Sequence, residues 1–301
     1  MMYGNILEAI GNTPVIRLNK LTAGLSSKVY VKLESKNPGG SIKDRAALSM
    51  IIDAESKGLL AKGGTVIEPT SGNMGIGLAM VAAVRNYKVV IVMPDTMSKE
   101  RISMMKAYGA DVVLTPGKEG MTGALKTADE IAEKTNGFIL QQFRNPANPA
   151  AHYVQTAREI LEDVPEVDYV VAGIGTGGTV TGIGRALKDF SSDAKVIGVE
   201  PAESPLITEG RTGPHDIQGI GANFIPDNYD RNAVKRVITV KSSDAVDTAR
   251  RLAREEGIFA GISSGAAVSA ALKLAAGERN KTFVAILPDG GDRYLSTGMF
   301  D

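Results

Sequence analysis

The chain has 301 residues, of which 43% are hydrophobic and 34 are glycine, which indicates a compact α/β protein of two domains rather than one. Its 34 basic and 34 acidic residues cancel at pH 7, so no broad basic surface for nucleic acid is expected. Cysteine is absent, which excludes disulfides, thiolate metal sites and thiol nucleophiles.

Short β-branched runs alternate with amphipathic stretches along most of the chain. The runs predict strands at residues 28–34, 65–69, 88–93, 111–115, 138–141, 168–173, 195–200, 234–240 and 282–288. The stretches between them predict helices at 98–108, 122–135, 153–162 and 244–256. This alternation predicts an α/β fold with mostly parallel sheets covered by helices on both faces.

Neither a metal site nor a membrane segment is expected. The two histidines, His152 and His215, are far apart in sequence and are expected on the surface or in loops. The N-terminal stretch lacks the features of a signal peptide, and the apolar runs are too short to cross a bilayer. A cytoplasmic location is the resulting expectation.

Lys43 lies at the expected start of a helix, in the stretch NPGGSIKDRAA (37–47). Pro38, Gly39 and Gly40 predict a turn, and Ser41 is a candidate N-cap residue. A lysine in the first turn meets the positive end of the helix dipole, which disfavours its charged form. This conflict between residue and position is a first indication of a chemical role.

The stretch EPTSGNMGIG (68–77) follows a predicted strand and opens a predicted helix. Thr70, Ser71, Gly72 and Asn73 offer hydroxyls, an amide and backbone N–H groups at a helix N-terminus, which is a favourable place for a carboxylate or another anion. An ordinary capped helix start explains the same residues equally well.

The stretch RNPANPAAH (144–152) interrupts the alternation with two Asn-Pro pairs, which disfavour helix. We therefore place a domain boundary near these residues.

A second glycine-rich loop follows the strand predicted at 168–173. Its N–H groups can surround a phosphate, and its residues are Gly175, Thr176, Gly177, Gly178 and Thr179. Gly173, Gly175 and Gly178 also match the dinucleotide fingerprint, with Glu200 placed as the ribose-binding acid. The loop alone therefore leaves a dinucleotide and a smaller phosphate ligand open.

A third loop, GISSGAAVSAAL (261–272), places Ser263 and Ser264 before an alanine-rich helix. A simple helix start explains the pair, and a small hydroxyl beside a cofactor is the sharper alternative.

Taken in order, eight motifs resemble those of the cysteine synthase (O-acetylserine sulfhydrylase) family, within the β-family of pyridoxal phosphate enzymes. The motifs are IGNTPVIRL (10–18), NPGGSIKDRAA (37–47), EPTSGNMGIGLA (68–79), QQFRNPANP (141–149), GTGGTVTG (175–182), HDIQGIGANFIP (215–226), GISSGAA (261–267) and DRYLSTGMF (292–300). Each motif is weak by itself, but the ordered set is specific and spans nearly the whole chain. A lysine, a phosphate loop and an anion site are together what such a cofactor requires.

The resemblance implies a role for each residue singled out above. Lys43 would form the Schiff base with pyridoxal 5'-phosphate and act as acid and base on the substrate's α-carbon. The implied cofactor contacts are Asn73 with the ring hydroxyl, Ser263 with the pyridine nitrogen, and Gly175, Thr176, Gly177, Gly178 and Thr179 with the phosphate. The implied substrate contacts are Thr70, Ser71, Gly72, Met74, Gln142 and Gly221. No metal is implied.

The implied reaction is a β-replacement in which O-acetyl-L-serine and sulfide give L-cysteine and acetate through an aminoacrylate intermediate. A serine hydroxyl does not keep the ring nitrogen protonated as an aspartate would, which suits elimination better than transamination. Cystathionine β-synthase-like, cysteine desulfhydrase and lanthionine-forming relatives share nearly all the motifs and remain alternatives. A nicotinamide-dependent oxidoreductase is the alternative that residues 173–178 alone allow.

Two residues depart from the family pattern. Met74 replaces a frequent threonine beside the substrate carboxylate, and Asn223 replaces a frequent glycine near the site entrance. Both departures concern the choice of donor and nucleophile and leave the cofactor residues unchanged.

The resemblance also implies the tryptophan synthase β-like fold (fold type II), with two three-layer α/β domains and the cofactor in the cleft between them. The smaller domain would be residues 36–148, including a mobile segment that closes over substrate. The larger domain would be residues 1–35 plus 149–301, including the phosphate loop. A homodimer is implied, and docking of the C-terminal tail of serine acetyltransferase is a further expectation.

Overall fold

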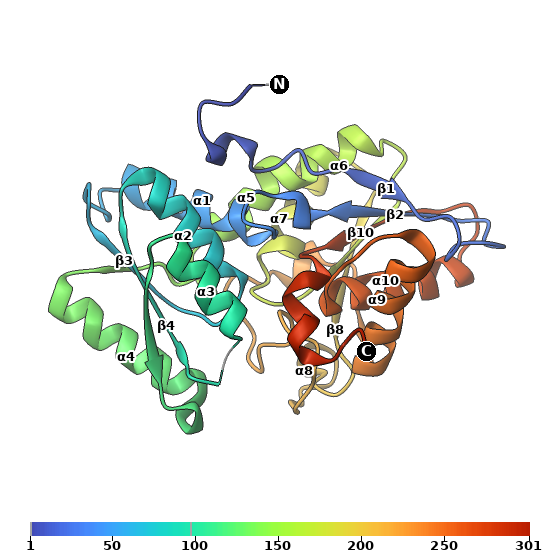
Figure 1. Cartoon of the computed structure of the whole chain (residues 1–301). Helices are drawn as coiled ribbons and strands as arrows, with labels where there is room; N and C mark the ends of the chain where they lie inside the picture. The colour runs from blue at the N-terminus through green and yellow to red at the C-terminus, as the bar shows by residue number, and fades with distance from the viewer. Residues whose placement is uncertain (1, 97) are drawn as a thin grey trace. The chain divides into compact units, whose positions relative to one another are not determined.

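The computed structural model describes residues 2–96 and 98–301 and divides the chain into two compact units (Figure 1). Unit 1 comprises the residues up to Ile10 together with Asn37–Ala147, and unit 2 comprises Gly11–Lys36 together with Asn148–Asp301. Each unit has its own sheet and its own hydrophobic core.

A parallel sheet in the order β5-β4-β3-β6 forms the centre of unit 1. Its strands are β3 (Thr65–Pro69), β4 (Lys88–Pro94), β5 (Asp111–Thr115) and β6 (Phe138–Ile139). Ile67 pairs with Val90 on one side and with Ile139 on the other. The inner strands are buried and apolar because helices cover both faces of the sheet.

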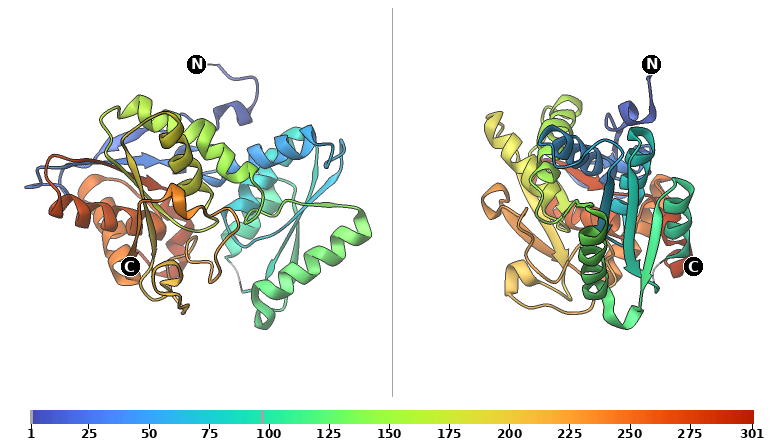
Figure 2. Two further views of the ribbon diagram at one scale, coloured as in Figure 1. Left: turned by 180° about the vertical axis from the view of Figure 1, so that it is seen from behind. Right: turned by 90° about the vertical axis from the view of Figure 1, so that its left-hand side faces the viewer.

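The helices of unit 1 divide between the two faces of this sheet. They are α1 (Lys43–Ser56), α2 (Asn73–Arg85), α3 (Lys99–Ala107) and α4 (Gly120–Thr135). Val66 and Ile91 lie in one core with α1 and α2, whereas Ile67 and Val92 lie in a smaller core with α4. This alternation follows from the two-residue period of a strand. Figure 1 and the reverse view in Figure 2 show α4 alone on its face.

The sheet of unit 2 has the order β1-β2-β10-β7-β8-β9. Its strands are β1 (Val15–Arg17), β2 (Lys28–Leu33), β7 (Tyr169–Gly173), β8 (Lys195–Pro201), β9 (Arg236–Val240) and β10 (Thr282–Leu287). The edge strand β1 pairs antiparallel with β2, and the other pairings are parallel.

Helices also lie on both faces of the second sheet. They are α6 (Ala157–Asp163), α7 (Gly178–Asp189), α8 (Leu206–Glu209), α9 (Ser242–Glu256) and α10 (Ile262–Gly277). Helices α9 and α10 share the main core with Val171 and Phe283, and α7 packs against β7 and β8. Helices α6 and α7 come to the front in the view from behind in Figure 2.

Short 3₁₀ segments complete the chain at Ile6–Ala9, Glu34–Lys36, Gly117–Glu119, Arg231–Ala233 and Gly291–Thr297. All nine predicted strands are present, and the prediction of mostly parallel sheets is confirmed. Strand β1 was not predicted, because its three residues, which follow a Thr-Pro pair, are too few to show the alternation of apolar and polar residues that predicts a strand.

The expectation that residues 1–35 join the second domain is wrong for residues 2–10, while Met1 lies outside the described residues. Leu7 and Ile10 are buried in the core of unit 1, and their 3₁₀ turn contacts α2. Burial of these two apolar side chains is what attaches the N-terminal segment to unit 1.

The stretch at 144–152 is more helical than its prolines suggested. Helix α5 (Ala147–Ala151) begins within it and is followed by a π-helical segment, His152–Thr156. Pro149 lies in the first turn of α5, where its missing N–H removes no helical hydrogen bond. The division between the two units falls at the start of this helix.

Candidate active site

In unit 1, two helix starts lie close together. Lys43 is the first residue of α1 and Asn73 is the first residue of α2. A Cβ on Gly77 would lie 3.0 Å from Oδ1 and 3.3 Å from the backbone N of Asp44, so glycine allows the two helices to approach. The Ser41 hydroxyl accepts a hydrogen bond from the Lys43 N–H at 3.2 Å, although the N-cap residue is Ile42 rather than Ser41.

The Lys43 amine is partly buried, and its acidity is unusual. Burial lowers its pKa to about 8, and the nearby Glu68 carboxylate opposes this effect. A substantial fraction of the amine is therefore neutral and nucleophilic near neutral pH. This supports the chemical role inferred from its position in the sequence.

The loop between β3 and α2 presents donors to an anion. The Gly72 N–H donates to the Thr70 hydroxyl at 3.3 Å, and no side chain caps α2. The first N–H groups of an uncapped helix are available to a ligand, and the helix dipole favours a negative charge there. Ser71, Gly72 and Asn73 are partly exposed, so a small carboxylate can reach them.

Met74 does not offer a polar group at this loop. Its side chain is 1% exposed and belongs to the core of unit 1. The expected substrate contact at this position therefore has to come from the backbone, and the methionine contributes packing where a threonine would contribute a hydroxyl.

Sequence analysis missed Glu68, the residue that begins this loop motif. Its carboxylate is buried and accepts hydrogen bonds from the N–H groups of Gln141 at 3.0 Å and Gln142 at 3.3 Å. Gln142, a predicted substrate residue, is itself 6% exposed. A charged residue within an otherwise apolar buried strand was the signal that could have identified Glu68.

In unit 2, the second predicted loop connects β7 to α7. Gly177 has φ +79° and is the N-cap of α7, and the Gly178 N–H donates to the Thr176 hydroxyl at 3.4 Å. A Cβ on Gly175 would lie 2.3 Å from the carbonyl oxygen of Gly219, so only glycine fits there. The structure therefore places the loop Gly175–Thr179 at the start of α7, and a helix start of this kind favours an anion.

Two residues that sequence analysis did not assign hold the loop's threonines. Asn148 donates to the Thr176 hydroxyl at 2.9 Å. His152 lies with Nε2 3.4 Å from the Thr179 hydroxyl and Nδ1 3.0 Å from Thr156. The expectation of a surface or loop position is wrong for His152, which is 2% exposed within the π-helical segment.

The segment around Gly219–Gly221 lies beside both the loop Gly175–Thr179 and Ser263. The Gly221 N–H donates to the Ile174 carbonyl at 3.0 Å, and His215 lies 2.9 Å from the Gly221 carbonyl. Ser263, buried in the first turn of α10, has its hydroxyl 3.9 Å from the Cβ position of Gly219. The structure thus brings the predicted residues of unit 2 together around one glycine segment.

Glu200 is committed to local hydrogen bonds. Its carboxylate accepts from the N–H of Ile207 at 2.9 Å and from the N–H and hydroxyl of Thr208 at 3.0 and 2.6 Å. Both oxygens of this carboxylate bind the start of α8, so they are not directed at a ribose. This argues against the dinucleotide alternative.

The departure at Asn223 has a backbone explanation. Asn223 has φ +61°, and asparagine is among the few residues other than glycine that adopt this conformation readily. Its side-chain oxygen accepts a hydrogen bond from Ser204 at 2.8 Å. Asparagine therefore preserves the turn and ties it to the segment that follows β8.

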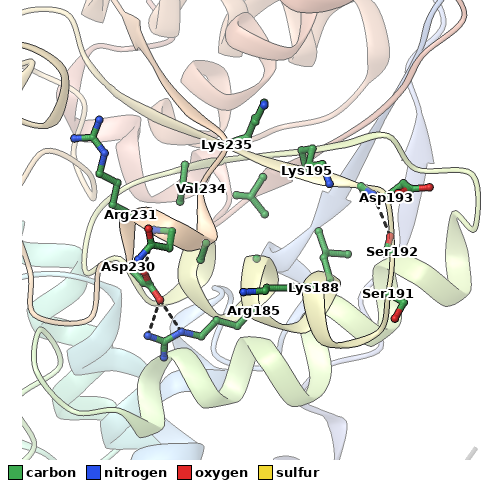
Figure 3. Close-up of a pocket in the computed structure, with 16 residues that line it drawn as sticks. Arg185, Lys188, Ser191, Ser192, Asp193, Lys195, Asp230, Arg231, Val234 and Lys235 are labelled. Carbon is green, nitrogen blue, oxygen red and sulfur yellow. Dashed lines mark hydrogen bonds and ion pairs between the residues drawn. The ribbon is translucent and has the colours of Figure 1, made fainter.

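A separate open cavity of about 660 Å³ lies in unit 2, where β8 and β9 begin (Figure 3). Arg185 is paired with Asp230, and Lys188, Lys195 and Lys235 are exposed. Ligands of parallel sheets bind at the carboxyl ends of strands, so we do not assign this cavity to the active site.

Within residues 2–96 and 98–301 no group of acidic or histidine side chains is arranged to hold a metal ion. Among the same residues, no helix has both the length and the apolar character that a bilayer crossing needs.

Comparison with known proteins gives consistent matches. The family model described as pyridoxal-phosphate dependent enzyme matches residues 6–289. The cysteine synthase of Staphylococcus aureus is 48% identical over 299 residues, covering 98% of this chain and 96% of the relative. The O-ureido-L-serine synthase of Streptomyces lavendulae is 49% identical over 303 residues, covering 100% and 93%. The crystal structure of cysteine synthase from Entamoeba histolytica superposes with a TM-score of 0.97 at 45% identity, covering 100% of this chain and 91% of that one.

Proposed function

Because the chain belongs to the family of pyridoxal-phosphate-dependent enzymes, we propose that it is a cysteine synthase, which converts O-acetyl-L-serine and sulfide into L-cysteine and acetate. The observation that carries the proposal is Lys43, a partly buried amine with a lowered pKa at a helix start. The near-full-length similarity to a cysteine synthase supplies the reaction class.

The described residues fit the cofactor. Gly175 allows the loop to pack against Gly219, and the start of α7 favours a phosphate through its N–H groups and the helix dipole. Lys43 would hold the aldehyde carbon through Nζ, Asn73 the ring hydroxyl, Gly175–Thr179 the phosphate, and Ser263 the ring nitrogen. When bound, pyridoxal phosphate withdraws electrons from the α-carbon of an amino acid, which makes the α-proton acidic.

The chain's own groups then have defined tasks. The Lys43 Nζ accepts the α-proton, and a pKa of about 8 leaves part of it unprotonated for that step. The N–H groups and hydroxyls of Thr70–Asn73, with Gln142, bind the substrate's carboxylate and orient its α-carbon toward the lysine. Ser263 offers a neutral hydroxyl, so it stabilises the ring nitrogen without adding a negative charge beside it.

Relatives with other substrates supply a second candidate. The O-ureido-L-serine synthase is as similar to this chain as the cysteine synthase is, so the serine-derived part of the substrate is better supported than the nucleophile. Met74 adds to this point, because it removes a hydroxyl from the carboxylate loop. A cystathionine β-synthase-like, sulfide-releasing or lanthionine-forming activity is the alternative to be tested.

A product assay separates these candidates. Purified protein loaded with pyridoxal phosphate would be mixed with O-acetyl-L-serine and either sulfide, homocysteine or L-cysteine, and the amino acid products identified by mass spectrometry. We expect L-cysteine from sulfide as the fastest reaction, and a faster product from homocysteine or L-cysteine would replace our proposal with the corresponding alternative.

Lys43→Ala is the matched control for that assay. The substitution removes the partly buried amine and leaves a residue that favours helix, so we expect near-complete loss of turnover with an unchanged far-UV circular dichroism spectrum. Substantial remaining turnover would contradict the role given to Lys43.

Three further expectations rest on the resemblance. We propose a homodimer, docking of a serine acetyltransferase C-terminal tail and a cytoplasmic location. Light scattering of the purified protein tests the first, and titration with a peptide of that tail tests the second.

A further inference from the structure

Glu68 has a position that the reaction described above does not explain. It lies in β3, two residues before Thr70, and its side chain is 1% exposed. Its Oε2 accepts from the Gln141 N–H at 3.0 Å and its Oε1 from the Gln142 N–H at 3.3 Å. The Gln142 side chain also hydrogen-bonds to this carboxylate.

The backbone that Glu68 contacts is in an unusual conformation. Gln141 has φ +58°, which residues with a side chain rarely adopt. Two successive N–H groups around such a residue form a small concave anion site. The occupant here is the Glu68 carboxylate, which gives these donors a charged acceptor. The Gln141 carbonyl accepts from the N–H groups of Arg144 and Asn145, each at 2.9 Å, which fixes the turn from its other side.

Strand pairing places this turn beside the carboxylate loop. Ile67 pairs with Ile139, and the Leu140 N–H donates to the Ile67 carbonyl at 3.2 Å. Residues 141–142 therefore follow β6 at the same sheet edge where residues 70–72 follow β3. We propose that Glu68 is a positioning residue, whose carboxylate holds Gln141 and Gln142 in the conformation that directs Gln142 at the substrate's carboxylate.

The energetic cost of Glu68 is consistent with such a task. Burial raises the pKa of Glu68 to about 7 even though the N–H donors favour its charged form. A buried carboxyl that is costly to ionise is unfavourable for stability, and groups of this kind concentrate at functional sites. The part of the proposal that concerns substrate rests on the function proposed above.

Hydrogen exchange tests the conformational half in cofactor-free protein, where no activity is needed. We expect slow exchange at the Gln141 and Gln142 amides in the wild-type protein and exchange about ten-fold or more faster in Glu68→Gln. The two N–H groups donate to different carboxylate oxygens, and the substitution replaces one of these acceptors with an NH2 group, which only donates. Amides of β4 should exchange at the wild-type rate in the variant. Unprotected amides in the wild-type protein, or equal protection in Glu68→Gln, would overturn the proposal.

A double-mutant cycle tests the substrate half. The apparent dissociation constant of O-acetyl-L-serine is read from the visible absorption of the bound cofactor in wild type, Glu68→Gln, Gln142→Ala and the double variant. We expect each single variant to weaken binding about ten-fold and the double variant to be little worse than Gln142→Ala alone, because Glu68 acts through Gln142. Independent, multiplicative effects would contradict the proposal.

Two additions keep the test decisive. Glu55→Gln, which removes a carboxylate paired with Arg85 in the same unit, should change neither exchange at residues 141–142 nor the dissociation constant. If Glu68→Gln does not fold, Glu68→Asp takes its place, because it keeps the charge but shortens the side chain. Amide exchange at residues 141–142 is then compared between the wild-type protein and Glu68→Asp. Failure of the wild-type protein to respond to O-acetyl-L-serine would count against the proposed function, whereas the exchange result stands independently of it.

Discussion

Lys43 is the residue whose chemistry sets the pH response of the site. Its pKa of about 8 lies below the ordinary value of 10.5 because burial disfavours the charged amine. The neutral amine is the form that attacks an aldehyde, so it accumulates as the pH rises through 8. We predict that the rate at which cofactor-free protein binds pyridoxal phosphate rises between pH 7 and 9 and then levels.

The binding rate is measured from the increase in the bound cofactor's absorption. At each pH it is divided by the rate at which a simple alkylamine reacts with pyridoxal phosphate. A normalised rate that still increases beyond pH 10 would show an ordinary lysine. In Glu68→Gln the midpoint of the rise in normalised rate with pH should move to lower pH, because the carboxylate that favours the protonated lysine is lost.

Asn223 gives a prediction about backbone conformation. Its positive φ suits glycine and is strained for alanine, and its side chain accepts from Ser204. We predict that Asn223→Ala is less stable than Asn223→Gly by about 1 kcal/mol, since alanine adds left-handed strain to the same lost hydrogen bond. Urea unfolding of the two variants measures the difference, and equal stability would show that the turn relaxes.

The sequence marked candidate site residues, but it did not mark the residues that contact them. Glycine turns marked Lys43 and the loops at 70–73 and 175–179. The lysine is unfavourable at a helix start, whereas the hydroxyl, amide and glycine residues of the loops are favourable there for binding an anion. Glu68, Asn148 and His152 were missed because their contacts are with partners 27 to 74 residues away. Long-range hydrogen bonds of this kind leave no local pattern.

The packing of α9 on α10 depends on one glycine. A Cβ on Gly265 would lie 2.0 Å from the Ala245 carbonyl oxygen, a backbone atom that cannot move alone. We predict that Gly265→Ala lowers stability by about 2 kcal/mol, in the range of overpacked cores, although alanine is the better helix former.

Gly277, at the end of the same helix, is the matched control. Apart from its chain neighbours and the backbone of its own helix, no atom of the described residues lies within 4 Å of its Cβ position, so Gly277→Ala should be neutral or slightly stabilising. Thermal unfolding of both variants by circular dichroism makes the comparison, and similar melting temperatures would show that the helix crossing is adaptable.

The elements that the sequence predicted share strong local signals. The nine predicted strands are short β-branched runs bounded by turn residues. Strand β1 was missed because its pairing with β2, rather than its three residues, makes it a strand. Helix α5 was missed because its Asn-Pro pair reads as a break, whereas a proline is tolerated in a first turn. The first miss is a case in which a tertiary pairing decides the structure, and the second is a local rule for proline that depends on its position in the helix.

At the scale of the whole chain, each unit encloses its own core, so a ligand held by one unit should stabilise that unit directly. The proposed phosphate loop Gly175–Thr179, the residues Asn148 and His152 that contact it, and Ser263 all belong to unit 2. Binding to a folded unit and not to its unfolded chain shifts the unfolding equilibrium by mass action. This linkage allows the loop to be tested without any catalytic reaction.

We predict that inorganic phosphate raises the melting temperature of cofactor-free protein more than chloride of equal ionic strength, because the N–H groups of Gly175–Thr179 and two hydroxyls bind it. The Lys43→Ala variant should retain the full shift, since Lys43 belongs to unit 1. Replacing both Thr176 with alanine and Thr179 with valine should reduce the shift, because it removes the two hydroxyls that Asn148 and His152 contact and leaves only the backbone N–H groups. General salting-out acts on every variant alike, so an undiminished shift in the double variant would mean that phosphate stabilises the protein without occupying this loop.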